Sequence, residues 1–254
     1  MDPALYAYAV VRRSHPLPEA EPVLPGAELR LIAAGGVAAL VSEVPRGLFE
    51  AGPTCRTDDP GWVAARAAAH HGVITAATAD GPALPMAFGG LFSGADPLRA
   101  WLAPREQRLA VALGLVAECA EWTVSLSEDS AMHGHWLEDH DPALQGLANE
   151  AAMATPGRRF LLQRRLERDL AAARVAHGIL VGAQVTATIG VQGRSLRADT
   201  AQGRWSFLLP NAGVDRLRDR LDATARELAG TGFTLALSGP WPPYGFAREV
   251  NSDA

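Results

Sequence analysis

Lysine is absent from this sequence, and all 23 basic residues are arginine. A catalytic lysine is therefore excluded, and the basic groups are all guanidinium ions, which favour bidentate carboxylate pairs and stacking on aromatic rings. The formal net charge is −5, whereas nucleic-acid-binding domains are usually basic. We therefore expect no nucleic-acid partner.

Cysteine is scarce, and the two present, Cys55 and Cys119, show neither CxxC nor metal-type spacing. So few thiols favour a reducing compartment over a disulfide framework. The opening residues lack the basic region of a secretory signal, and no apolar run approaches the ~18 residues of a membrane-spanning helix. We therefore predict a cytoplasmic protein without a membrane partner. Cys119 falls among apolar residues of a predicted helix and is interpreted as an inert core residue.

Common catalytic signatures are also missing. The sequence contains no GxxxxGK[ST], no GxGxxG after a strand, no GxSxG and no HExxH. The segment 133–141 carries three carboxylates together with His133, His135 and His140, which could in principle hold Zn²⁺. Gly134 and the irregular spacing favour a solvated acidic loop, so metal binding by these histidines is the less favoured reading. We expect no catalytic residue, cofactor or metal.

A second pair of imidazoles, His70 and His71, lies in a predicted helix over residues 60–78. Asp59 and Pro60 are a typical start for a helix, with an N-cap followed by proline in the first turn. Adjacent helical residues point about 100° apart, because one turn takes 3.6 residues. We therefore expect at most one of the two histidines to face the core.

The first half of the chain predicts strands and helices in mixed order. An apolar run over 5–11 indicates a buried strand, and two runs joined at Gly35-Gly36 indicate a β-hairpin. The predicted elements are strands 5–11, 29–33, 37–42 and 84–88, and helices 60–78, 95–102 and 105–119.

The second half begins with a half-buried strand in which Trp122, Val124 and Leu126 alternate with polar residues. A loop-rich acidic insert is predicted over 129–156, followed by helices 158–176 and 213–229 and by strands 179–190, 204–209 and 233–238. This β-α-β-β-α-β order is that of a ferredoxin-like unit. We therefore predict an α+β protein with two domains, over 1–119 and 120–238, and a C-terminal tail over 239–254.

Charge is distributed unevenly. Between Arg108 and Arg158 there is no basic residue, whereas the predicted helix that follows carries six arginines by residue 174. Two interpretations stay open: the acidic and basic segments pair within the fold, or they present charged faces that steer a partner.

The tail opens with Gly-Pro-Trp-Pro-Pro-Tyr-Gly-Phe at 239–246. Its three prolines fix the backbone and remove donors, which predicts an extended, semi-rigid strip. Such a strip either packs on its own domain or docks on a partner, and packing is the favoured interpretation. The side chains concerned are those of Trp241, Pro242, Pro243, Tyr244 and Phe246.

This segment closely resembles the GPWPPYSF signature near the C-terminus of the GvpF/GvpL family of gas vesicle proteins. Further similarities follow in the family's order, at residues 6–11, 41–45, 84–92 and 121–124 and at His70. The resemblance spans about residues 6–247. The chain departs from the family pattern at Ala87, Gly90 and Ser125 and in the acidic insert.

The resemblance implies two α+β domains, the second a modified ferredoxin fold, and a function in binding rather than catalysis. Gas vesicle shells are built from a small, very hydrophobic subunit, which would aggregate if left free. Family members are expected to bind that subunit and other accessory gas vesicle proteins, and to assist vesicle formation as minor components. The sequence does not distinguish the F from the L subtype.

Trp241, Pro242, Pro243, Tyr244 and Phe246 are the expected contact residues for this partner. The alternative function, from another class, is a ferredoxin-like small-molecule-sensing or regulatory module, since a fold alone does not determine a function. A metal-dependent hydrolase using the segment 133–141 is the least favoured possibility.

Overall fold

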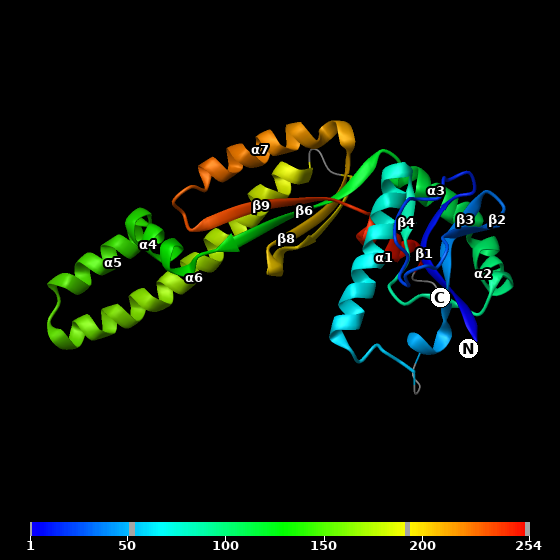
Figure 1. Cartoon of the computed structure of the whole chain (residues 1–254). Coiled ribbons are helices and arrows are strands. Elements are labelled where there is room, and N and C mark those ends of the chain that lie inside the picture. Colours follow the sequence, from blue (N-terminus) through cyan, green and yellow to red (C-terminus); the bar gives the residue numbers. More distant parts are fainter. Residues whose placement is uncertain (1, 51–53, 191–193, 252–254) are drawn as a thin grey trace. The chain divides into compact units, whose positions relative to one another are not determined.

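The computed structural model of this chain describes residues 2–50, 54–190 and 194–251. They form an α+β structure with two sheets (Figure 1). The chain divides into two compact units, one of residues 1–121 and 240–254 and the other of residues 122–239. The C-terminal segment is therefore part of the first unit.

The first unit is built around β1 (Pro3–Arg12), whose side chains are almost all buried. β1 pairs antiparallel with β3 (Val37–Pro45), β4 (Ala83–Pro85) and β5 (Leu91–Phe92), and β2 (Arg30–Ala34) pairs with β3. The continuous apolar run of β1 reflects this central position, because both faces of the strand are covered.

Two expectations for this unit are confirmed by the strand and helix boundaries. The β2–β3 hairpin turns at Gly35-Gly36, where Gly35 has a φ of 60°, a conformation that favours glycine. α1 (Pro60–Asp80) begins after Asp59, whose carboxylate accepts hydrogen bonds from the Gly61 and Trp62 amides. Its buried residues, at 70, 73, 74 and 77, follow helical spacing.

The remaining helices of the first unit are α2 (Ala95–Leu102), α3 (Glu106–Val116) and α8 (Tyr244–Asn251). The prediction that a helix reaches residue 119 is wrong. Ala117 is extended and Glu118 has a φ of 57°, so the helix ends at Val116, and Cys119 begins a strand where it is half-buried.

The second unit holds β6 (Cys119–Glu128), which starts in the first unit, together with β7 (Arg194–Asp199), β8 (Arg204–Pro210) and β9 (Phe233–Trp241). The sheet has the order β7-β8-β6-β9, and β7 and β8 are antiparallel. α7 (Val214–Glu227) packs beside the long helix α6 (Pro156–Gly190).

The predicted strand over 179–190 is wrong, because these residues continue α6. They include several β-branched residues, but the buried ones, Val181, Val185, Thr188 and Ile189, are spaced by four, three and one, which places them on one helical face. Packing on the sheet has therefore overridden β propensity. The second strand of the unit is instead β7, which follows α6, so the β-α-β-β-α-β order is retained.

The predicted loop over 129–156 is also wrong, because the segment forms α4 (Ser130–His140) and α5 (Pro142–Met153). Asp129 caps α4 and Asp141 caps α5, each through two backbone amides, and Pro142 occupies the first turn of α5. Figure 1 shows α4, α5 and the first half of α6 extending beyond the end of the sheet of this unit.

The C-terminal strip is extended only as far as Trp241, the last residue of β9. From Tyr244 the chain is helical as α8, so the predicted extended conformation over the rest of the segment is wrong. Pro242 and Pro243 lie between strand and helix, where the missing N–H groups cost little.

The cap of α5 can be tested directly. Asp141→Ala leaves the Ala143 and Leu144 amides without their side-chain acceptor, so we expect the free energy of unfolding to fall by about 1 kcal/mol. Urea unfolding followed by circular dichroism measures the change. Asp139→Ala, which alters an exposed residue of α4, is the matched control; equal losses in the two variants would contradict the capping role.

Candidate functional site

The C-terminal residues expected to contact a partner are mostly packed against the first unit. Pro242, Pro243 and Phe246 are buried, and the Tyr244 hydroxyl lies 2.8 Å from Nδ1 of His71. Burial raises the pKa of Tyr244 to about 12. Trp241 differs from these four, because 43% of its surface is exposed and its ring centroid lies 6.2 Å from that of His71.

The start of α8 is fixed by a buried carboxylate. The Gly245 amide donates to Glu121 over 2.8 Å, and a side chain at position 245 would crowd the same carboxylate. Close packing against Glu121 therefore explains why residue 245, within the aromatic signature, is glycine. The segment is an anchor for α8 that leaves one aromatic ring, that of Trp241, at the surface.

The histidine pair on α1 is divided as expected, with His70 buried and His71 half-buried. Nδ1 of His70 lies 3.0 Å from the Tyr6 hydroxyl, and its ring stacks on Tyr8. Burial lowers the pKa of His70 to about 4. His70 is therefore neutral near pH 7 and belongs to the core of the first unit.

The three histidines of the segment 133–141 all lie on α4 and do not converge. His135 is exposed near Glu138, His140 stacks on Trp136, and His133 is fully buried. Within the described ranges, no three His, Cys, Asp or Glu side chains are grouped so that they could hold a metal ion. Helical spacing separates these histidines, because position 135 points away from position 133, and position 140, on the same face as 133, lies about 10 Å further along the helix at 1.5 Å per residue.

His133 instead belongs to a polar cluster that joins α4, α6 and β6. Its Nδ1 lies 2.8 Å from Glu128, and its Nε2 lies 2.8 Å from Nδ1 of His177. Arg174 donates two hydrogen bonds to the same Glu128 oxygen. Sequence reasoning missed His177, which lies 44 residues from His133 and carries no local motif.

The electrostatics of this cluster follow from its burial and its hydrogen bonds. Burial alone would raise the pKa of Glu128, but hydrogen bonds from His133 and Arg174 outweigh it, so that pKa is lowered. Burial, and then the proximity of His133, lower the pKa of His177. The cluster thus combines an ionised carboxylate with a His177 imidazole that resists protonation.

The arginines of α6 are occupied within the second unit. Arg158 pairs with Glu150 and Arg174 with Glu128, while Arg164, Arg165 and Arg168 pair with acidic residues of α6 itself. Arg159 donates to three carbonyl groups at the end of α5. Two of these ion pairs, Arg158–Glu150 and Arg174–Glu128, join the acidic segment to the basic helix, and the others lie within α6.

The second half of α6 is apolar and largely uncovered. By length and composition alone α6 could cross a membrane, which is weak support for a span, and only 11% of its most apolar 18-residue stretch is buried. Val175, Ile179 and Leu180 are exposed by 66%, 67% and 67%. Sequence reasoning missed this surface because Arg174, His177 and Gln184 interrupt the apolar run.

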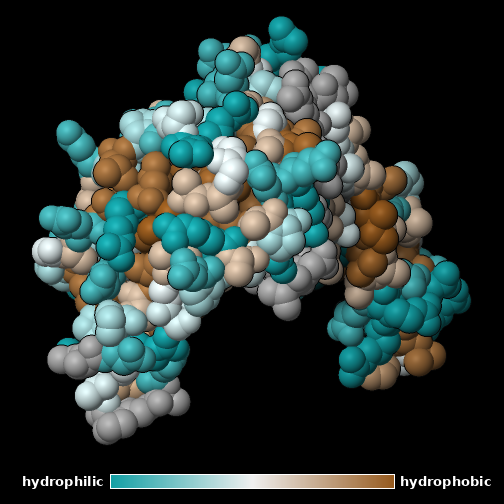
Figure 2. Space-filling model, turned by 90° about the vertical axis from the view of Figure 1, so that its right-hand side faces the viewer, coloured by the Kyte–Doolittle hydropathy of each residue, from teal (hydrophilic) through white to brown (hydrophobic). Residues whose placement is uncertain are grey.

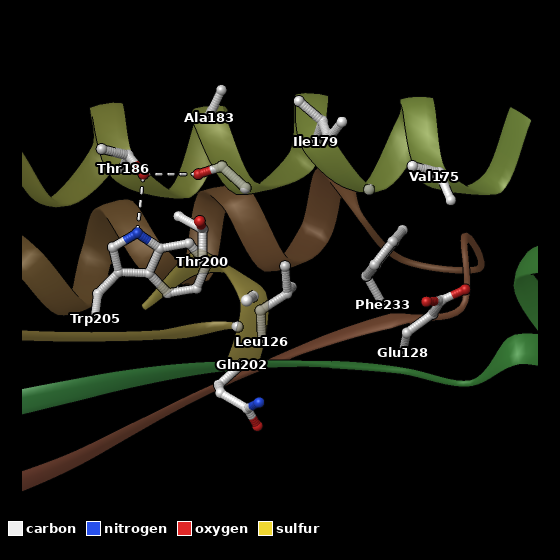
Figure 3. A pocket seen from close by; sticks show the side chains of 14 residues that line it. Leu126, Glu128, Val175, Ile179, Ala183, Thr186, Thr200, Gln202, Trp205 and Phe233 are labelled. Carbon is white, nitrogen blue, oxygen red and sulfur yellow. Dashed lines mark hydrogen bonds between the residues drawn. The ribbon is translucent and has the colours of Figure 1, made fainter. Parts of the chain in front are cut away.

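Beneath this helix lies a groove of about 720 Å³. Figure 3 shows Val175 and Ile179 on α6 at its upper side, and Leu126 and Phe233, from β6 and β9, below the helix. Glu128 lies at one end of the groove, and Thr186, bonded to Trp205, lies towards the other. Between these ends the lining is mixed, because Leu126, Val175, Ile179 and Phe233 are apolar whereas Thr200 and Gln202 are polar. The part of the groove between α6 and Phe233 is suited to binding an apolar surface.

Exposed apolar side chains are not confined to α6. On the face shown in Figure 2, brown apolar areas alternate with teal polar ones. The first unit exposes Val111 and Leu115 on α3 by 60% and 62%. These residues match the α6 residues in exposure but do not line the groove.

The fold is that of a known class of gas vesicle protein. It is similar to the crystal structure of GvpF from an Anabaena species, with a TM-score of 0.70, 16% sequence identity and coverage of 96% of this chain and 98% of that one. A crystal structure of GvpF from Microcystis aeruginosa gives a TM-score of 0.65 at 13% identity, with the same coverage.

Sequence comparison assigns the family. The model of the family "Gas vesicle synthesis protein GvpL/GvpF" matches residues 4–248, so the chain belongs to this family. Gas vesicle protein F of a Streptomyces species is 29% identical over 250 residues, covering 96% of this chain and 99% of that one. Gas vesicle protein L2 of Halobacterium salinarum is 31% identical over 189 residues, covering 68% and 67%. The resemblance found in the sequence is therefore confirmed.

The buried His70 predicts a dependence of stability on pH. Its pKa is about 4 in the fold and about 6.5 in the unfolded chain, so the unfolded state binds more protons between these values. Stability should be fully present above about pH 6.5 and should fall by on the order of 3 kcal/mol as the pH drops to about 4. Urea unfolding between pH 4.5 and 7.5 measures it.

His70→Phe removes the titrating group and is the comparison variant for this measurement. We expect a lower stability at pH 7.5, because the Tyr6 hydrogen bond is lost, together with a shallower dependence on pH. The lowered pKa of His177 adds a residual slope of the same sign in both proteins. An unchanged slope in the variant would show that His70 is not the group that titrates.

Proposed function

We propose that this protein is a gas vesicle assembly protein that binds the hydrophobic shell subunit and assists the nucleation or formation of vesicles as a minor component. The observation that carries the proposal is the uncovered apolar half of α6 in a protein of the GvpL/GvpF family. Exposed apolar area of this kind commonly marks an interaction site. A partner that is itself very hydrophobic would gain most by covering it.

The same proposal includes the remaining expectations about the protein's surroundings. It acts in the cytoplasm, stays associated with the gas vesicle, and meets other accessory gas vesicle proteins there. The family names of its relatives support this setting. Binding rather than bond-making is the proposed role, because the site described above is an apolar surface without an activated nucleophile.

We also propose that the second unit is a modified ferredoxin-like fold. Its β-α-β-β-α-β order and the strand order β7-β8-β6-β9 support this assignment. The modification is that three helices, α4, α5 and α6, lie between the first two strands, where the β-α-β-β-α-β order has one. These helices carry the exposed apolar side chains of Met153, Phe160 and Leu161, and those of the second half of α6.

Of the C-terminal residues, Trp241 is the proposed contact. Its ring is at the surface, while Pro242, Pro243, Tyr244 and Phe246 support the anchoring of α8. Exposed tryptophans are frequent sources of binding energy at interfaces, because they bury a large area at a small entropic cost.

The proposed function is tested by mixing this protein with the shell subunit. The shell subunit, diluted from detergent, should aggregate by light scattering when alone and remain dispersed when an equimolar amount of this protein is present. Trp241→Ala should fold normally and should weaken binding of the shell subunit about tenfold.

The matched control is Leu17→Ala, which truncates another exposed apolar side chain of the first unit. If Trp241→Ala fails to fold, the tryptophan is structural. If it folds and binds as the wild type does, Trp241 is not a contact. A wild-type protein that neither binds nor disperses the shell subunit would contradict the proposed function itself.

A further inference from the structure

We propose that the groove between α6 and the strands of the second unit is the docking site for an uncharged, apolar α-helix of the shell subunit. This inference rests on the proposed function and goes beyond it by assigning a site and the conformation of the bound segment. The groove combines Val175 and Ile179 on one side with Leu126 and Phe233 on the other (Figure 3).

The charges of the groove favour an occupant without charge. Among the described residues that line the groove, Glu128 is the only charged one, and it already accepts hydrogen bonds from His133 and Arg174. A basic side chain entering the groove would lose its hydration without gaining a free carboxylate. An acidic side chain would face the same carboxylate and be repelled.

Two of the polar side chains at the groove, those of Trp205 and Thr186, are already paired. The Trp205 indole donates to the Thr186 hydroxyl over 2.9 Å, and that hydroxyl donates to the Gly182 carbonyl over 2.8 Å. Because these groups are paired with each other, a polar ligand would have to break existing bonds. The α6 side of the groove therefore favours apolar surface, whereas Thr200 and Gln202, between β7 and β8, add polar groups to the lining.

The backbone around the groove favours a helix over an extended segment. The Leu126 amide is bonded to the Gly203 carbonyl, and the Asp129 amide to the Gly232 carbonyl, each over 2.8 Å. An extended peptide would find these groups taken, and each of its own amides left unpaired on burial would cost about 1–3 kcal/mol. A helix satisfies its backbone internally and avoids that cost.

The size of the groove agrees with such an occupant. Val175 and Thr186 lie near its two ends on α6 and are about 16 Å apart along the axis, at 1.5 Å per residue. An apolar helix of about three turns lying along α6 would match this length. The volume of about 720 Å³ would then receive the side chains of one face of that helix.

One wall of the groove is fixed before any partner arrives. Glu128 accepts hydrogen bonds from His133 and Arg174, and His133 is hydrogen-bonded to His177. These bonds hold β6, α4 and α6 together at the end where Phe233 lies. A preformed wall lowers the entropic cost of binding.

The site is tested with two variants of equal chemistry. Ile179→Glu places a carboxylate in the groove, and Val111→Glu places one on an equally exposed apolar position of α3. Both should keep the circular dichroism spectrum and thermal midpoint of the wild type. We expect Ile179→Glu to weaken binding of the detergent-solubilised shell subunit at least tenfold and Val111→Glu to leave it unchanged.

These outcomes separate the site from the function. If the wild type binds the shell subunit and Ile179→Glu binds equally well, the groove is not the site and the proposed function stands. If the wild type does not bind, the proposed function fails. If sedimentation shows a wild-type dimer that Ile179→Glu dissociates, the groove is an interface between copies of this chain and the inference is overturned.

The conformation of the occupant is tested with three synthetic peptides of about fourteen residues. One is a helical Leu/Ala peptide, one an alternating Val/Thr peptide that favours strands, and one the helical peptide with a central lysine. The helical peptide should bind the wild type but not Ile179→Glu, and the lysine should weaken its binding at least tenfold. Stronger binding of the Val/Thr peptide, or no binding by any of them, would overturn the helical assignment.

Discussion

The structure of the second unit depends on one constraint, namely that α6 is longer than the sheet it covers. A helix over Pro156–Gly190 measures about 52 Å, whereas the ten residues of β6 span about 33 Å. One face of the C-terminal half of α6 packs on the sheet through Val181, Val185 and Ile189. The N-terminal half must overhang, and α4 and α5 cover part of it. The groove lies on the C-terminal half, where the helix and the strands leave a gap between Val175 and Ile179 on one side and Leu126 and Phe233 on the other.

Polar contacts hold the overhanging helices in place. Arg159 satisfies carbonyl groups at the end of α5, where a helix leaves its last acceptors without partners. Near the start of α4, the buried His133 links Glu128 to His177. These contacts need particular partners at particular distances. They therefore define one arrangement of the helices in a region where apolar packing alone would allow several.

How far the sequence predicts this fold depends on whether the signal is local. The buried strand β1, the Gly35-Gly36 hairpin and the Asp59 cap are local patterns, and all three are confirmed. The frequent β-branched residues over 179–190 favour a strand, whereas tertiary packing selects a helix. Asp129 and Asp141 are typical N-caps, a local signal that the acidic composition of the segment obscures. The pairing of His133 with His177 needs the fold itself, since no local pattern joins residues 44 positions apart.

The strength of the proposed interaction suits a protein that assists assembly. Burying a Val or Ile side chain completely contributes about 1.5–3 kcal/mol, and Val175 and Ile179 are each already about one third covered. Together these two α6 residues can contribute about 2–4 kcal/mol, to which Leu126 and Phe233 add and from which the cost of association is subtracted. The contribution of the two α6 residues alone corresponds to dissociation constants of about 1 mM or weaker. A surface of this strength holds an apolar helix only until a larger apolar interface is offered. Under the proposed function, the growing shell would offer such an interface, and the subunit would transfer to it without any covalent step.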